Sequence, residues 1–401
     1  MVENTALVVD DDSTARLVLT SMLEHIGCDS IAANDGNEAL SYVDSSGVSV
    51  VLCDWDMPGM SGVDLCAQLR ARDEGRYIYF ILVSGRTERD SIVAGLEAGA
   101  DDFICKPVDL DELTVKIKSA FRVINLERQL EERNARLQRA YATVTDDLLI
   151  AGNIQSNLLP VPYPGEGCDT AWLFRPAQYV SGDMFDYFKF EDKYWVFFIM
   201  DVEGHGIPSA LTVFSVNNQL NPAAVGLCAR MLHTCDTVAE ACIGTVTELN
   251  ARSSTQGGRY FTMIYGVLDL ETGIVTMTQA GHPPALHLSH KSGNIEAVGD
   301  GGMPVGLLED ASFDAVSCQL EPGDRLFVYS DGTIECTDEE ENLYGIERME
   351  NRITELKEES VSVVCQKIDE DLIEWNGEKP FDDDVSLLAI EFTGVKSPQS
   401  D

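Results

Sequence analysis

Two groups of aspartates lie next to apolar runs in this chain, where strands are expected to begin or end. The first group is Asp10, Asp11 and Asp54, and the second is Asp183, Asp201, Asp331 and Asp383. Carboxylates that lie close together repel one another unless a cation neutralises them, and magnesium-type cations prefer carboxylate oxygen. The two groups therefore predict two separate metal sites. A chain with two such sites is expected to combine a switch with a metal enzyme.

Apolar runs in residues 1–122 predict the strands of a parallel sheet. They cover residues 6–9, 48–53, 77–83 and 103–105, and stretches of helical period lie between them. Such strands alternating with helices are typical of a doubly wound α/β fold, in which ligands bind beyond the carboxyl ends of the strands. Five polar residues that follow the runs are therefore expected to converge at one edge: Asp10, Asp11, Asp54, Ser84 and Lys106.

This expected cluster could accept a phosphoryl group. A carboxylate beside a divalent cation, with a hydroxyl and an ammonium opposite, can take up phosphate and stabilise its charge. The alternative for any one of these aspartates is a solvated loop end. Five residues in this order favour a functional site instead.

Four strings carry these residues, and at them the chain resembles the response-regulator receiver domain. The strings are LVVDDDS (7–13), CDWDMPGMSG (53–62), LVSG (82–85) and DFICKPV (102–108), and the resemblance covers residues 1–122. It implies that Asp54 takes phosphate from the phosphohistidine of a sensor histidine kinase or of a phosphotransfer protein. It also implies one Mg²⁺ ion, held by Asp10, Asp11, Asp54 and the backbone carbonyl of Asp56.

The same resemblance implies roles for further residues. Ser84 and Lys106 would hold the phosphoryl oxygens. Phe103 stands at the position of the family's aromatic switch, and its rotation would carry the signal to the last helix. The peptide bond before Pro107 is expected to be cis, as in the family.

Residues 123–158 are expected to form a helical linker that joins two domains. Apolar residues recur at alternating steps of three and four, interrupted by Arg133: Val123, Leu126, Leu130, Leu137, Ala140 and Val144. This is a short heptad pattern. Between Phe121 and Ile150 five arginines balance five acidic residues, so the stretch can self-associate. A parallel coiled-coil dimer is the preferred interpretation, and a single amphipathic helix packed on one domain is the alternative.

Residues 159–394 are expected to form an α+β domain, a sandwich of two sheets flanked by helices. Strand-like runs cover 194–200, 261–268, 274–278, 325–329 and 385–392, and helical stretches lie near 210–220, 236–250 and 347–373. Asp201 and Asp331 follow two of the runs, whereas Asp383 and Asp384 precede a third. Residues 395–401 are expected to be a disordered tail.

Six strings in this region resemble the metal-dependent PPM protein serine/threonine phosphatases, in particular the bacterial branch that includes sporulation and general-stress phosphatases. The strings are SGDMFD (181–186), DVEGHGIPSAL (201–211), RYFTMIYGVLD (259–269), AGHPPAL (280–286), LEPGDRLFVYSDGTIE (320–335) and DDDVSLLAI (382–390), and the resemblance runs from residue 153 to 392. It implies two Mn²⁺ or Mg²⁺ ions bridged by Asp201, with the backbone carbonyl of Val202 on one of them. Asp183 would complete one side of this centre, and Asp331 with Asp383 the other. Such a pair activates water for attack on phosphorus, so the enzyme needs no nucleophilic side chain.

Three further residues are possible members of this site: His205, His282 and Asp384. The histidines stand in GHG and GHP contexts, where shaping a loop is the preferred interpretation over direct proton transfer. Two positions depart from the family pattern, because Ser181 replaces a usual glycine and Glu203 a usual small residue. Glu203 adds charge near the expected site, and its role stays open.

The composition limits which binding partners and which cellular compartment are expected. The chain has 401 residues and a formal net charge of -40, so its surface repels nucleic acid phosphates and anionic lipid. No apolar run reaches the roughly 18 to 20 residues of a membrane helix, and the first ten residues lack a leader pattern. Eleven cysteines without a CxxC pair indicate reduced thiols. We therefore expect a cytoplasmic protein that binds neither DNA nor a membrane.

Together these expectations describe a two-component response regulator with a phosphatase output. Phosphorylation of Asp54 is expected to control the phosphatase, whose substrate, by the resemblance, would be a phosphoserine anti-sigma factor antagonist. The alternative is a non-enzymatic adaptor that binds a sigma factor or its regulator and uses the phosphatase fold only as a docking surface. The presence of all four aspartates of the second group favours the enzyme, because such adaptors can lose them.

Overall fold

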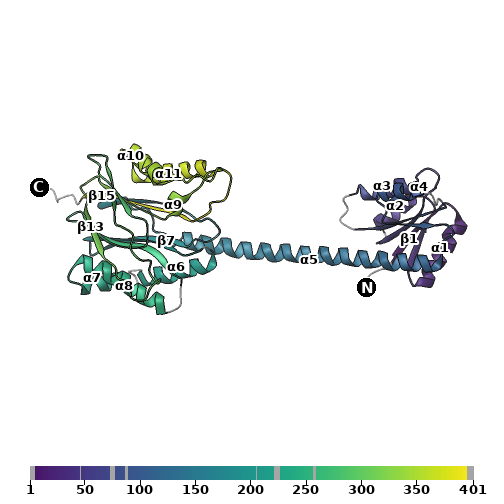
Figure 1. Cartoon of the computed structure of the whole chain (residues 1–401), viewed down its shortest axis with the longest axis horizontal. Helices are drawn as coiled ribbons and strands as arrows, with labels where there is room; N and C mark the ends of the chain where they lie inside the picture. Colours follow the sequence, from purple (N-terminus) through teal and green to yellow (C-terminus); the bar gives the residue numbers. More distant parts are fainter. Residues whose placement is uncertain are drawn as a thin grey trace. The chain divides into compact units, whose positions relative to one another are not determined.

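The chain divides into two compact units, Met1–Ala142 and Thr143–Asp401. A computed structural model describes residues 5–45, 47–72, 77–85, 89–204, 206–220, 226–255 and 259–394 (Figure 1). The tail expected at residues 395–401 therefore lies outside the described residues.

The first unit is a five-stranded parallel sheet, in the order β2-β1-β3-β4-β5. Its strands are β1 (Thr5–Val9), β2 (Asp29–Ala33), β3 (Val50–Asp54), β4 (Tyr79–Ser84) and β5 (Asp102–Cys105). Its helices are α1 (Ser13–Ile26), α2 (Gly36–Ser45), α3 (Gly62–Arg70), α4 (Arg89–Glu97) and the first part of α5 (Leu110–Ser156). The predicted doubly wound α/β fold is confirmed.

Both faces of this sheet are buried, and alternate residues of each strand serve different cores. In β1, Ala6 and Val8 belong to the core under α1 and α5, whereas Leu7 and Val9 belong to the core on the other face. This arrangement explains the continuous apolar runs of the sequence. Strand β2 was not predicted, because it lies at the edge of the sheet and only Ala33 of its residues is buried.

Local capping sets where the helices beside the strand ends begin. Asp12 caps α1, because its carboxylate accepts a hydrogen bond from the backbone N–H of Thr14 at 2.9 Å. Ser61 and Asp64 form a capping box at the start of α3. Gly62, which follows Ser61, lies so close to the end of β3 that an added Cβ would be 2.3 Å from the carbonyl oxygen of Asp54. The glycine therefore lets α3 begin directly against the strand that carries Asp54.

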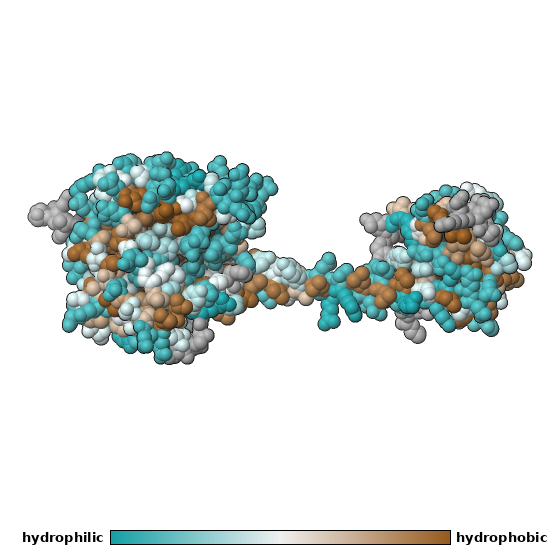
Figure 2. All heavy atoms as spheres, viewed as in Figure 1, coloured by the Kyte–Doolittle hydropathy of each residue, from teal (hydrophilic) through white to brown (hydrophobic). Residues whose placement is uncertain are grey.

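Helix α5 is a single helix of 47 residues that includes residues 123–156 of the predicted linker. Several apolar side chains of its heptad pattern are exposed, among them Leu126, Leu130 and Leu137. Apolar surface is visible along this helix in Figure 2. None of the helices in the described ranges combines the length and apolar character that crossing a bilayer requires.

The second unit is the predicted sandwich of two sheets, and each sheet has five antiparallel strands. One sheet has the order β13-β10-β9-β8-β7 and the other β12-β11-β14-β15-β6. The strands are β6 (Gly167–Arg175), β7 (Asp183–Phe190), β8 (Tyr194–Val202), β9 (Phe261–Asp269), β10 (Ile274–Ala280), β11 (Ala285–Leu288), β12 (Ile295–Val298), β13 (Ala315–Gln319), β14 (Arg325–Tyr329) and β15 (Val385–Gly394). The main core lies between the two sheets, and a second core lies between the second sheet and the helices on its outer face. Alternate residues of one strand serve the two cores: Leu388 belongs to the main core and Leu387 to the second.

Helices cover the outer face of each sheet. Helices α6 (Ile207–Leu220), α7 (Leu227–Thr234) and α8 (Val238–Thr255) belong to the first sheet, and α9 (Gly332–Glu335), α10 (Ile346–Glu355) and α11 (Val361–Asn376) to the second (Figure 1). The helical stretch expected at 347–373 is two helices, because Ser360 caps a new one by accepting the backbone N–H of Val363. All eleven cysteines are free, as expected.

Candidate functional site

Three aspartates of the first unit converge at the point where the strand order reverses. Asp10 follows β1 and Asp54 ends the neighbouring β3, and carboxylate oxygens of Asp10, Asp11 and Asp54 lie within 4.8 Å of one another. Asp10 and Asp54 are buried, whereas Asp11 is exposed. No other group of three possible metal ligands is this close within the described parts of the chain. This geometry suits a hard divalent cation with water on its open side.

Lys106 closes the other side of this cluster. Its Nζ lies 2.9 Å from Oδ2 of Asp10 and 2.7 Å from Oδ1 of Asp54, and its peptide bond to Pro107 is cis, as predicted. Burial raises the pKa of Asp54, and the ammonium of Lys106 opposes that rise. Burial lowers the pKa of Lys106, but its hydrogen bonds to Asp54 and Asp10 outweigh burial and raise it. The lysine is thus held as a cation beside the expected phosphoacceptor.

The remaining residues of the predicted receiver site lie around this edge. Ser84 is buried at the end of β4, and Asp56 follows β3 by two residues. Phe103 is buried in β5 and contacts the ring of Trp55 edge to face, with 6.4 Å between ring centroids. Since Trp55 follows Asp54 directly, the aromatic pair joins β5 to the phosphoacceptor's strand.

In the second unit, the ends of strands from both sheets form a cavity of about 300 Å³. Its lining residues are Asp201, Glu203, Gly204, Tyr260, Phe261, Thr262, Asp331, Asp382 and Asp383. Asp201 belongs to β8 of one sheet, and Asp331 and Asp383 flank β14 and β15 of the other. The sandwich therefore brings three of the four predicted carboxylates to one cavity. Gly332 permits this approach, because an added Cβ would lie 2.2 Å from the carbonyl oxygen of Asp384.

The fourth predicted carboxylate lies beside Asp201. Asp183 is directly opposite Asp201 in the β7–β8 pair, so the two side chains share one face of the sheet. Asp183 is buried, and its Oδ2 has no hydrogen-bond partner among the described residues. An orphaned carboxylate oxygen in this position fits a cation better than it fits an apolar core.

The electrostatics of these aspartates also fit divalent cations. Burial, and then repulsion by Asp331 and Asp383, raise the pKa of Asp201 to about 7. Burial and the neighbouring Asp201 raise the pKa of Asp183 well above its usual range. Such groups repel one another until positive charge arrives. A bound divalent cation would relieve this repulsion.

Asp384 has a different role from its neighbours. Its Oδ1 accepts the backbone N–H of Ala177 at 2.7 Å, and its Oδ2 accepts that of Gly182 at 2.6 Å. Both oxygens are thus used to hold the backbone segment that leads into Asp183. This geometry favours positioning of the site over the metal-ligand role that the sequence left possible.

Of the two histidines in the sequence prediction, His282 lies within the described residues. His282 is buried, and its Nδ1 lies 2.7 Å from the hydroxyl of Thr262, which lines the cavity. Burial lowers the pKa of His282 to about 3, which favours a neutral ring and a structural role beside Thr262. His205 lies outside the described residues. Glu203 is exposed at the cavity, where its backbone carbonyl accepts Nη1 of Arg259 at 2.7 Å.

Gln155 is a site residue that the sequence reasoning missed. It is fully buried near the end of α5, its Nε2 donates to the carbonyl of Ser181, and its Oε1 accepts the N–H of Ser181, both at 2.9 Å. The hydroxyl of Ser181 in turn accepts the N–H of Asp183 at 2.9 Å. Gly152 lets the helix approach, since an added Cβ would lie 2.0 Å from the carbonyl oxygen of Tyr179. Nothing in the local sequence distinguishes Gln155 from the other glutamines of the helix.

Comparisons with known proteins agree with both resemblances. The model of the "Stage II sporulation protein E (SpoIIE)" family matches residues 191–393, and that of the "Response regulator receiver domain" matches residues 6–118. The DNA-binding response regulator MtrA of Mycobacterium tuberculosis is 39% identical over 116 residues, which are 29% of this chain and 50% of MtrA. The chain thus spans about half the length of the first curated relatives that it matches.

Two further relatives each cover one unit. The chemotaxis protein CheY of Pseudomonas aeruginosa is 33% identical over 120 residues, which are 30% of this chain and 97% of CheY. The solved SiaA-PP2C domain of Pseudomonas aeruginosa is 19% identical, with a TM-score of 0.53, and the match covers 63% of this chain and 98% of that domain. The second unit therefore has the PP2C, or PPM, phosphatase fold. The chain belongs to the SpoIIE family and carries a response-regulator receiver domain ahead of its PPM-type phosphatase domain.

Proposed function

We propose that this protein is a metal-dependent phosphatase that acts on phosphoserine in a protein, and that phosphorylation of Asp54 controls it. The cavity at the ends of the two sheets carries the proposal. It gathers Asp201, Asp331 and Asp383, and the unpartnered oxygen of Asp183 lies beside it. Carboxylates with raised pKa values and no cationic partner suit catalytic divalent metals better than they suit a structural core.

In this proposal each aspartate has a separate task. Asp201 and the backbone carbonyl of Val202 hold two Mn²⁺ or Mg²⁺ ions, Asp183 completes one side, and Asp331 with Asp383 completes the other. When bound, such a pair activates water and neutralises charge on the phosphoryl group. Asp384 keeps Asp183 in place through its hydrogen bonds to Ala177 and Gly182.

The receiver domain supplies the control in this proposal. A sensor histidine kinase or a phosphotransfer protein donates phosphate to Asp54, with Mg²⁺ held by Asp10, Asp11, Asp54 and the backbone carbonyl of Asp56. Ser84 and Lys106 bind the phosphoryl oxygens, and Phe103 responds by rotating. The contacts of Lys106 with Asp10 and Asp54 support this assignment, since they keep a cation where the phosphoryl charge would develop.

Helix α5 and Gln155 offer a physical route for this control. The helix is continuous from the receiver domain to Ser156, and Gln155 holds the backbone next to Asp183 through Ser181. A shift of the helix would therefore move a metal-binding carboxylate. This route consists of direct hydrogen bonds between Gln155 and Ser181. It can therefore be tested by replacing one side chain.

Replacing Gln155 with alanine is expected to uncouple the phosphatase from the receiver. The change removes both hydrogen bonds to Ser181, so the position of Asp183 should no longer follow α5. Hydrolysis of p-nitrophenyl phosphate should then differ by less than about twofold with and without acetyl phosphate. Gln138→Ala, at an exposed site on the same helix, is the matched control and should keep the parent's response. A full response in Gln155→Ala would exclude this route.

We also propose that α5 mediates a homodimer. Leu126, Leu130 and Leu137 are 60%, 54% and 67% exposed, so the described parts of the chain do not cover this apolar face. The heptad spacing matches the same face of a second copy. The double change Leu130→Glu and Leu137→Glu is expected to convert the dimer to a monomer, measured by light scattering in the full chain. Gln129→Glu with Gln138→Glu should leave the dimer intact, and a monomeric parent would contradict the proposal.

The proposed substrate is a phosphoserine anti-sigma factor antagonist. The SpoIIE family membership supports a phosphoprotein substrate, and the narrower class follows from the resemblance to the sporulation and stress branch. The test measures manganese-dependent hydrolysis of p-nitrophenyl phosphate and of such a phosphoprotein, with and without acetyl phosphate. Hydrolysis that changes with the donor supports the proposal and gives the sign of control. No hydrolysis under any condition would favour the sigma-factor adaptor instead.

A further inference from the structure

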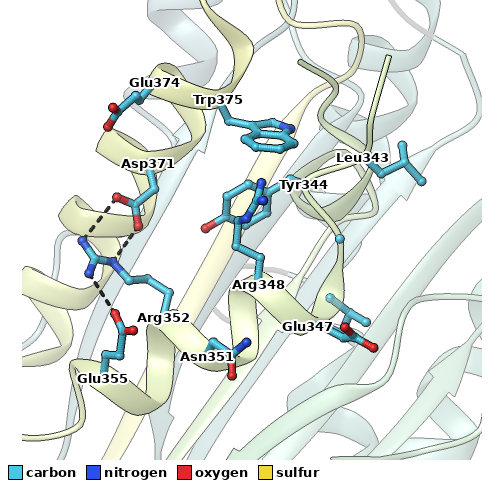
Figure 3. A pocket seen from close by; sticks show the side chains of 12 residues that line it. Leu343, Tyr344, Glu347, Arg348, Asn351, Arg352, Glu355, Asp371, Glu374 and Trp375 are labelled. Atoms are coloured by element: carbon cyan, nitrogen blue, oxygen red, sulfur yellow. Dashed lines mark hydrogen bonds and ion pairs between the residues drawn. The ribbon is translucent and has the colours of Figure 1, made fainter. Parts of the chain in front are cut away.

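A second hollow lies in the phosphatase domain, between α10, α11 and the loop before α10. This groove has a volume of about 1090 Å³, and Figure 3 shows the side chains that line it. None of its lining residues belongs to the carboxylate cavity. Its size and polar lining suit a stretch of peptide better than they suit an enclosed small molecule.

The groove holds an arginine without an acidic partner. The guanidinium carbon of Arg348 lies 3.6 Å from the ring centroid of Trp375 and 5.5 Å from that of Tyr344. Among the described residues no carboxylate lies within 4.0 Å of it. In a chain with 68 acidic and 28 basic residues a counterion would be easy to supply. Stacking therefore fixes the orientation of Arg348 while its hydrogen-bonding edge stays available.

The other arginine of the groove shows the contrast. Arg352 is paired with Asp371 at 2.6 Å and with Glu355 at 3.2 Å. Figure 3 shows these three side chains along one wall, with Arg348 in the middle of the groove beside Tyr344 and Trp375. Two carboxylates neutralise Arg352, so Arg348 is the cation that the groove offers to a ligand.

Tyr344 supplies an independent sign of a ligand. Its side chain is only 3% exposed, yet its hydroxyl has no hydrogen-bond partner among the described residues. Burial, and then the Asp371 carboxylate, raise the pKa of Tyr344 to about 12, so the group stays an O–H donor. A buried donor without an acceptor is unfavourable, and a backbone carbonyl of a bound peptide would satisfy it.

The charges at the groove indicate what kind of peptide fits. Glu347 and Glu374 line it without ion pairs among the described residues. A ligand that is anionic throughout would be repelled by these two glutamates. A ligand with one carboxylate for Arg348 and basic side chains on either side would meet complementary charge at all three positions.

We propose that the groove between α10 and α11 docks an extended segment of a partner protein, in which an acidic residue is flanked by lysine or arginine. The partner is the protein substrate of the phosphatase, and this identification rests on the proposed function. The loop that carries Tyr344 also reaches the carboxylate cavity, because Thr337 donates its hydroxyl hydrogen to Asp382 at 3.0 Å. A substrate docked in the groove would thus contact a loop that is hydrogen-bonded to the wall of the carboxylate cavity.

The test is an array of immobilised peptides of about nine residues. The central residue is Glu or Gln, and the flanking residues are Lys, Ala or Glu. The full-length parent should bind the Glu-centred, Lys-flanked peptides about tenfold better than their Gln-centred partners. Arg348→Gln should lose that preference, whereas Lys291→Gln, an exposed control in the same domain, should keep it.

Two further variants examine the flanks and the hydroxyl. Glu347→Gln with Glu374→Gln should lose the preference for Lys flanks, and Tyr344→Phe should bind with unchanged charge selectivity but lower affinity. Near-ultraviolet circular dichroism checks that each variant is folded. Equal binding of Glu- and Gln-centred peptides by the parent, or an unchanged preference in Arg348→Gln, would overturn the proposal. Because binding is read without hydrolysis, these outcomes do not depend on whether the phosphatase is active.

Discussion

Replacing Asp201 with asparagine is expected to reduce manganese-dependent hydrolysis of p-nitrophenyl phosphate about a thousandfold or more. Asp201 lies between Asp183, its partner across the β7–β8 pair, and the Asp331 and Asp383 side of the cavity. An amide keeps the size of the side chain but removes the charge that would hold two cations together. Initial rates at saturating Mn²⁺ measure the effect.

The same variant should make the metal-free protein more stable. Asp201 is partly buried next to other carboxylates, and burial together with their repulsion raises its pKa to about 7. Asparagine removes one member of this repulsive group, so the melting temperature in chelator should rise. Mn²⁺ should stabilise the phosphatase unit of the parent and have little effect on that unit in the variant, because binding to the folded state alone increases stability.

Glu203→Gln is the matched control for Asp201→Asn. Glu203 lines the same cavity and also carries a negative charge, but the proposed metal set does not include it. We expect its activity to stay within about tenfold of the parent's. If Asp201→Asn kept more than about a tenth of the parent's rate, Asp201 would not be the central ligand.

Replacing Asp54 with asparagine is expected to abolish phosphorylation of the protein by acetyl phosphate, with a loss of at least about a hundredfold in acid-labile phosphate. An amide nitrogen does not take up the phosphoryl group, and it removes the carboxylate that Lys106 contacts at 2.7 Å. Chelation of Mg²⁺ should have the same effect in the parent. Phosphate-affinity electrophoresis separates the two forms.

The hydrolysis rate of the Asp54→Asn variant shows whether phosphorylation of Asp54 controls the phosphatase or only labels the receiver. Asp54→Asn should retain the basal rate on p-nitrophenyl phosphate and lose any change caused by the donor. Asp56→Asn is the control, because only the backbone carbonyl of Asp56 is assigned to Mg²⁺, and its labelling should resemble the parent's. A donor effect that persists in Asp54→Asn would show that the receiver does not control the phosphatase through this residue.

Both folds and the family could be predicted from the sequence. Apolar runs with polar residues at their ends reflect strands buried on both faces, and those ends are where a doubly wound sheet binds ligands. Asp10 and Asp54 could therefore be grouped before any coordinates. The strings around Asp201 and Asp331 likewise contained the family's pattern, so the carboxylates of the second site could be named, although not their spacing.

The residues that surround and support those carboxylates could be identified only from the folded structure. The hydrogen bonds of Gln155 to Ser181 span 26 residues, and that of Gly182 to Asp384 spans 202. Likewise, the burial that lowers the pKa of His282 and the stacking of Arg348 on Trp375 depend on how separate elements pack against one another. The spacing of apolar residues in the sequence reveals a strand or a helix, because residues close in sequence belong to the same element. Burial, pKa values and buried hydrogen bonds depend on which elements meet, and that is set only when the sheets pack.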